Sequence, residues 1–138
     1  MLPITMTIAQ LVAARAAGVE LAELDLPMQL AFDVRELLRD ITARLETFET
    51  QRRALFDRFG DERDTTELER RATGDLRVRE IRPADQQAYA EQITALLAVT
   101  VTFDRGPIGL PIGNGVQIKP RTLVGLGPFV QRDTAGGV

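Results

Sequence analysis

Residues 28–60, MQLAFDVRELLRDITARLETFETQRRALFDRFG, decide the fold of this chain. Neither Gly nor Pro interrupts the stretch from Met28 to Phe59. Within it, residues recur at alternating spacings of four and three, and all but one of these are apolar. We call these positions the seam: Val34, Leu38, Ile41, Leu45, Phe48, Arg52, Leu55 and Phe59. Such spacing is typical of a coiled-coil face and predicts one long helix over residues 27–60, roughly 45–50 Å long at 1.5 Å per residue.

Arg52 is the charged residue of the seam, and two interpretations of it are open. In the first, its aliphatic stem lies along the apolar side chains while the guanidinium reaches water. In the second, it pairs with an acid of another chain and fixes the register of an assembly, as polar seam residues can. The first interpretation is favoured.

The seam as a whole also has two interpretations. The rest of the chain covers it, or another subunit covers part of it. The helix that we expect to pack against it has about four turns, whereas the long helix has about nine. This mismatch favours a homo-oligomer or a larger assembly with other protein subunits, in which the seam is a packing and interface surface.

Shorter elements surround the long helix. Thr7 stands at an N-cap position, which predicts a helix over residues 8–17 ending at Gly18. A further helix over residues 83–97 carries Tyr89 and two aliphatic residues at helical spacing on one face. We expect it to pack antiparallel on the long helix as a coiled-coil-like hairpin.

The remaining segments are a strand, a loop and a tail. The alternation of β-branched residues in VTVTF predicts a strand over residues 99–103. Residues 61–75 are almost entirely polar and predict a solvated loop. Residues 104–138 form a turn-rich tail in which Asn114-Gly115 signals a hairpin turn. The predicted fold is therefore α+β, mainly α, in a single domain over residues 1–138.

Composition excludes several classes of function. The chain has 138 residues with a net charge of -3, which disfavours sequence-specific nucleic-acid binding because such affinity rests on clustered basic residues. No apolar run approaches the ~20 residues of a membrane span. The first ten residues carry no basic group, so we expect no secretory signal and a location in the cytoplasm, or in a particle assembled there.

The chemical inventory predicts a protein that is not an enzyme. The chain has no His and no Cys, which removes the usual nucleophile–base pairs and most zinc or iron sites. The acidic stretch Asp61, Glu62, Asp64, Glu67 and Glu69 lacks the spacing of a calcium loop and is interleaved with Arg residues that would pair with it. The glycines of residues 106–115 complete neither a phosphate-binding loop nor a dinucleotide site. We therefore expect no catalytic residue, no cofactor and no metal, and Lys119 is expected to be an ordinary surface residue.

Several short sequence segments, in this order along the chain, resemble segments of a known group of proteins. They are Thr-Ile-x-x-Leu at residues 7–11, Leu26-Pro27, FETQRRALFDRFGDE at residues 48–62, Arg-Val-x4-Pro-x5-Tyr at residues 77–89, and TLVGLGPFV at residues 122–130. The chain resembles small uncharacterised proteins that tailed bacteriophages and prophages encode near late structural genes. Its Gly-rich stretch over residues 106–115 departs from the plainer segment of that group.

The resemblance implies a virion or assembly protein, such as a capsid, neck or tail accessory subunit, located in the virion or the bacterial host cytoplasm. A small regulatory binding module, for example a phage-encoded inhibitor of a host protein, is the alternative. A carboxylate-dependent metal enzyme is the least favoured hypothesis.

Overall fold

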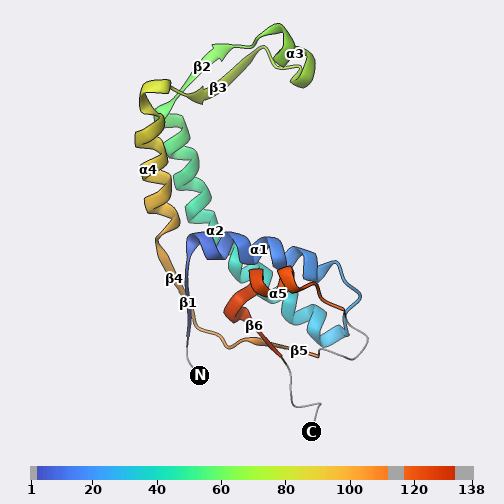
Figure 1. Ribbon diagram of the computed structural model, residues 1–138. Helices are drawn as coiled ribbons and strands as arrows, with labels where there is room; N and C mark the ends of the chain where they lie inside the picture. The colour runs from blue at the N-terminus through green and yellow to red at the C-terminus, as the bar shows by residue number, and fades with distance from the viewer. Residues whose placement is uncertain (1–2, 112–116, 133–138) are drawn as a thin grey trace. The chain divides into compact units, whose positions relative to one another are not determined.

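The computed structural model describes residues 3–111 and 117–132 (Figure 1). Helices dominate and the strands are short, so the predicted α+β, mainly α class is confirmed. The elements in chain order are β1 Ile4–Thr7, α1 Ile8–Ala22, α2 Met28–Phe59, β2 Gly60–Asp64, α3 Glu67–Thr73, β3 Arg77–Ile81, η1 Pro83–Asp85, α4 Gln86–Leu97, β4 Thr100–Phe103, β5 Ile108–Leu110, α5 Pro120–Leu126, η2 Gly127–Phe129 and β6 Val130–Arg132.

The chain divides into two compact units. Unit 1 contains residues 1–47 and 98–138, and unit 2 contains residues 48–97. Helix α2 contributes its longer first part to unit 1 and its last three turns to unit 2. This division was not predicted from the sequence.

Helix α1 of unit 1 starts where the sequence predicts and ends later. The Thr7 side chain accepts a hydrogen bond from the Gln10 backbone, and the Gln10 side chain accepts one from the Thr7 backbone, so the helix begins with a capping box. The predicted end at Gly18 was wrong, because the helix continues to Ala22. Gly18 is buried against α2, and a Cβ there would lie 2.7 Å from Leu38 Cδ2. This glycine allows close helix packing and does not cap the helix.

Two small sheets complete unit 1. Strand β4, within the predicted 99–103, pairs antiparallel with β1, and Ile4 stands opposite Phe103. Strands β5 and β6 pair in parallel, with Ile108 opposite Val130. The predicted hairpin turn at Asn114-Gly115 lies outside the described residues.

The core of unit 1 gathers apolar side chains from α1, α2, the strands and the α5–η2 segment. On α2 the buried stripe is Leu30, Val34, Leu37, Ile41 and Leu45, while Leu38 of the seam is only partly buried. A straight helix turns once per 3.6 residues, so a strict heptad pattern drifts around it. The buried side of α2 is accordingly wider than the seam.

Unit 2 consists of the end of α2, the β2–β3 hairpin with α3, and α4. Helix α4 runs antiparallel to the end of α2, as predicted, after a 3₁₀ turn at Pro83–Asp85 (Figure 1). The Tyr89 ring meets Phe56 and Phe59 edge-on, at centroid distances of 6.5 and 6.2 Å. These aromatic contacts join the two helices.

The prediction of a loop over residues 61–75 was wrong. Strand β2 pairs antiparallel with β3, and helix α3 connects them. Helix α3 has a capping box between Thr66 and Glu69, and it ends at Gly74 with φ of 78°, a left-handed conformation that glycine adopts readily. Local polar bonds thus build regular structure without an apolar pattern.

Candidate functional site

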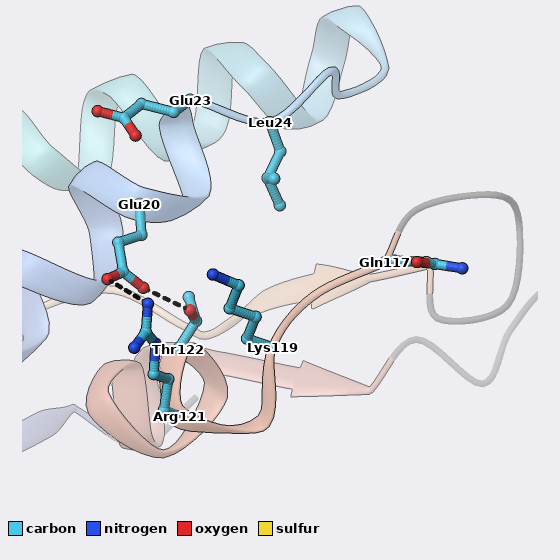
Figure 2. Close-up of a pocket in the computed structure, with 7 residues that line it drawn as sticks. All are labelled: Glu20, Glu23, Leu24, Gln117, Lys119, Arg121 and Thr122. Atoms are coloured by element: carbon cyan, nitrogen blue, oxygen red, sulfur yellow. Dashed lines mark hydrogen bonds and ion pairs between the residues drawn. The ribbon is translucent and has the colours of Figure 1, made fainter.

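A pocket in unit 1 lies between the end of α1 and the start of α5 (Figure 2). We call it the Lys119 pocket; its volume is about 370 Å³. It is lined by Glu20, Glu23, Leu24, Gln117, Lys119, Arg121 and Thr122. The two sides of the pocket come from segments about a hundred residues apart in the chain.

Glu20 holds the two sides together. The buried Thr122 hydroxyl donates to Glu20 Oε2 at 2.9 Å, and the Arg121 guanidinium lies 3.4 Å from Glu20 Oε1 (Figure 2). Both carboxylate oxygens are therefore engaged, and Arg121 neutralises the charge of Glu20. No local pattern in the sequence signals this bond, because Glu20 and Thr122 are 102 residues apart.

Lys119 differs from its neighbours in the pocket. Its ammonium is directed to the space between α1 and α5 (Figure 2), and it forms no hydrogen bond or ion pair with any residue that the structure describes. Leu24, 39% exposed, projects to the same space from the opposite side. The pocket therefore combines a cation with an apolar wall.

A smaller pocket of about 200 Å³, also in unit 1, is lined by Arg and Asp side chains that form polar bonds of their own. Arg105 donates to Asp40 at 2.7 Å. Arg44 donates to the Thr102 carbonyl at 3.4 Å and lies over the Phe103 ring, 5.7 Å from its centroid. These contacts tie α2 to the β4 segment and are structural.

The acidic stretch of unit 2 forms ion pairs, but the interleaved Arg residues supply only part of them, because Asp61 pairs with Arg82 and both Glu62 and Asp64 pair with Arg77. Arg63 binds Glu69 at 2.8 Å and Glu80 at 2.7 Å, and Arg71 binds Glu67 at 2.7 Å. The hydrogen bond from Arg63, helped by those from Thr66, lowers the pKa of Glu69 from 4.5 to about 2. Within residues 3–111 and 117–132, no cluster of acidic side chains is arranged to hold a metal ion.

The seam residues fall in both units. Val34, Ile41 and Leu45 are fully buried in unit 1, and Phe48 is buried in unit 2. Leu38, Leu55 and Phe59 are partly buried. Arg52 is exposed and pairs with Glu49 of its own helix at 2.9 Å. Pairing with an acid of another chain stays the less favoured interpretation.

The sequence reasoning missed a second apolar side of α2. Met28 is 89% exposed and Phe32 is 57% exposed, and they lie one turn apart. At 100° per residue, both point roughly opposite to Val34 and Ile41 of the seam. The signal was present, because these two large apolar residues do not fit the seam. In unit 2, Leu68 and Leu76 are also strongly exposed.

In the part of the chain that the structure describes, no helix is long and apolar enough to cross a membrane. No protein-family model, no curated protein and no solved structure matches this chain. The function therefore has to be inferred from the residues and their geometry.

Proposed function

We propose that this protein is a non-enzymatic structural or assembly subunit of a tailed-phage virion, a capsid, neck or tail accessory protein that acts through contacts with other protein subunits. The observation that carries the proposal is the Met28–Phe32 surface, defined by these two side chains on α2. Large apolar side chains exposed together on a helix are typical of protein-interaction sites.

The two sides of α2 have different roles in this proposal. The side that includes Val34, Ile41 and Leu45 packs into the core of unit 1 and anchors the helix. The opposite side presents Met28 and Phe32 at the i, i+4 spacing by which a helix inserts into an apolar groove. Phe32 supplies aromatic area and Met28 adapts its shape to the partner, two properties that interface anchors use.

The net charge of the chain supports the proposed class of partner, and the resemblance to phage proteins supports the proposed particle. A net charge of -3 favours a protein partner over nucleic acid. The segments FETQRRALFDRFGDE and TLVGLGPFV support the phage assignment through their likeness to phage proteins encoded near late structural genes.

The test is incorporation into native particles. Particles made with wild-type protein are compared with particles made with the Met28→Gln/Phe32→Gln double variant, and the chain is quantified by mass spectrometry. We expect a fixed stoichiometry for the wild type and loss of the variant. Val124→Gln is the matched control, because Val124 is 81% exposed in the same unit and lies outside the Met28–Phe32 surface. Equal incorporation of the double variant, or absence of the wild-type chain from particles, contradicts the proposal.

A small regulatory protein-binding module is the second candidate. The burial of Val34, Ile41 and Leu45 within their own chain favours it, because a monomer can then fold without another subunit. Size-exclusion chromatography with light scattering separates the two functions. A stable monomer that never enters particles supports the regulatory module, and rings or particle association support the structural subunit.

A further inference from the structure

We propose that the Lys119 pocket binds a carboxylate carried on a short aliphatic group. Such a ligand is either a free aliphatic carboxylic acid or the C-terminal residue of a polypeptide. The inference goes beyond the proposed function and rests on the pocket alone.

The charges of the pocket favour an anion. Arg121 pairs with Glu20 and the Thr122 hydroxyl donates to the other carboxylate oxygen, so both oxygens of Glu20 already have partners other than Lys119. The Glu23 carboxylate is directed away from the Lys119 ammonium (Figure 2). Among the residues that the structure describes, none bonds to the Lys119 ammonium, and the Arg121 guanidinium of the same pocket is largely exposed. A carboxylate bound there gains charge-assisted hydrogen bonds, which are stronger than neutral ones.

The side of the pocket opposite Lys119 is apolar and favours a ligand whose carboxylate carries an aliphatic group. Leu24 projects toward Lys119 from the segment that follows α1 (Figure 2). An aliphatic group attached to the carboxylate would cover this side chain and remove its apolar surface from water. The pocket volume of about 370 Å³ is at the small end of the range for ligand sites, which suits a ligand of the size of one amino-acid residue.

The test compares a carboxylate with its amide. The isotope-labelled full chain is titrated with N-acetyl-leucine and with N-acetyl-leucinamide, and binding is followed by NMR shifts of residues 117–123. We expect N-acetyl-leucine to bind with a Kd on the order of 1 mM and its amide to bind at least about tenfold more weakly, because the amide lacks the charge that Lys119 recognises. Added salt should weaken the binding of the acid.

Substitutions test whether Lys119 is the residue that binds the carboxylate. Lys119→Gln should weaken N-acetyl-leucine about tenfold, and Lys119→Arg should retain most of the binding. Arg39→Gln removes the same charge from an exposed position of α2 outside the pocket and should have no effect. Because the Lys119 side chain is exposed and has no partner among the described residues, its replacement should leave the melting temperature unchanged.

Hexanoate distinguishes the two sources of the ligand. Hexanoate binding as tightly as N-acetyl-leucine supports a free aliphatic acid, and clearly weaker binding supports a polypeptide C-terminus. Equal affinity for N-acetyl-leucine and its amide overturns the proposal. Unchanged affinity in Lys119→Gln, or no shifts up to the solubility limit of N-acetyl-leucine, also overturns it.

Discussion

Unit 1 and unit 2 are stabilised in different ways. Unit 1 buries apolar side chains from almost every element. Eight of its described leucine, isoleucine and phenylalanine residues are no more than 1% exposed: Leu11, Leu21, Leu37, Ile41, Leu45, Leu110, Leu126 and Phe129. In unit 2, all of whose residues the structure describes, Phe48 is the one large apolar side chain that is buried. The hairpin of unit 2 is held instead by ion pairs and caps around Arg63, Glu69 and Thr66.

The difference indicates where each unit is vulnerable. Apolar burial contributes roughly 25 cal/mol per Å², so deep core positions carry most of the stability of a domain. Exposed ion pairs contribute about 0–1 kcal/mol each. We therefore expect substitutions in unit 1 to act on the whole fold, and substitutions in the hairpin of unit 2 to act locally.

The largest effect is expected for Leu45→Asp. An unpaired carboxylate would be placed at a fully buried position of unit 1, which is costly enough to abolish cooperative folding. Leu68→Asp makes the same change at an exposed position of unit 2 and should stay within about 0.5 kcal/mol of the wild type. Circular dichroism during urea unfolding measures both. A cooperative transition retained by Leu45→Asp would show that the core of unit 1 tolerates a buried charge, contrary to this expectation.

Two truncations on α2, one in each unit, should have smaller effects and compare how much each unit depends on its leucine on this helix. Leu45→Ala should destabilise the protein by about 2–5 kcal/mol, the usual range for a leucine truncated in a core. Leu55→Ala should cost clearly less, because Leu55 is only partly buried. Denaturant titration of both variants and the wild type gives the two losses in free energy of unfolding to be compared. Equal losses would mean that unit 2 has a core as consequential as that of unit 1.

Acid should loosen the hairpin of unit 2. The pKa of Glu69 is about 2 in the fold and 4.5 ordinarily, so its ion pair with Arg63 stabilises the fold above pH 4.5. This contribution is lost as the pH falls from 4.5 toward 2. The protection factors of the β2 and β3 amides, which correct the exchange rates for their intrinsic pH dependence, should fall over that window in the wild type. Glu69→Gln removes the titrating group, and its protection factors should lack this transition; an identical transition in the variant would exclude Glu69 as its source.

The smallest effect is expected for Glu67→Lys. Glu67 and Arg71 pair on α3 with side chains 80% and 75% exposed, where water screens the attraction. Thermal unfolding should show a change equivalent to less than about 0.5 kcal/mol. A loss comparable with that of Leu45→Ala would show that our division between core and surface is wrong.

The sequence predicted the elements that follow from local patterns. Helix α2 has nearly the predicted bounds because an unbroken apolar repeat specifies it. The start of α1 was also predicted from a local signal, because Thr7 stands at an N-cap position. Helix α3 was missed although Thr66, Glu69 and Gly74 form readable cap signals, because the absence of apolar residues was given more weight.

Features that depend on distant residues could not be predicted. The Lys119 pocket requires α1 and α5 to meet, and the bond between Thr122 and Glu20 across this contact has no local signature. The burial of Leu37 in preference to Leu38 depends on which elements pack around α2. The exposure of Met28 and Phe32 depends in the same way on what the rest of the chain leaves uncovered.

The central claim is that the Met28–Phe32 side of α2 contacts other subunits while the opposite side packs within its own chain. Amide hydrogen exchange of α2 peptides, compared between the free chain and the chain in its native particle, tests this claim most directly. We predict that peptides covering residues 28–36 become protected in the particle, while those covering residues 41–45 exchange equally slowly in both states. Unchanged exchange over residues 28–36, with new protection only at Ile41 and Leu45, would contradict the account.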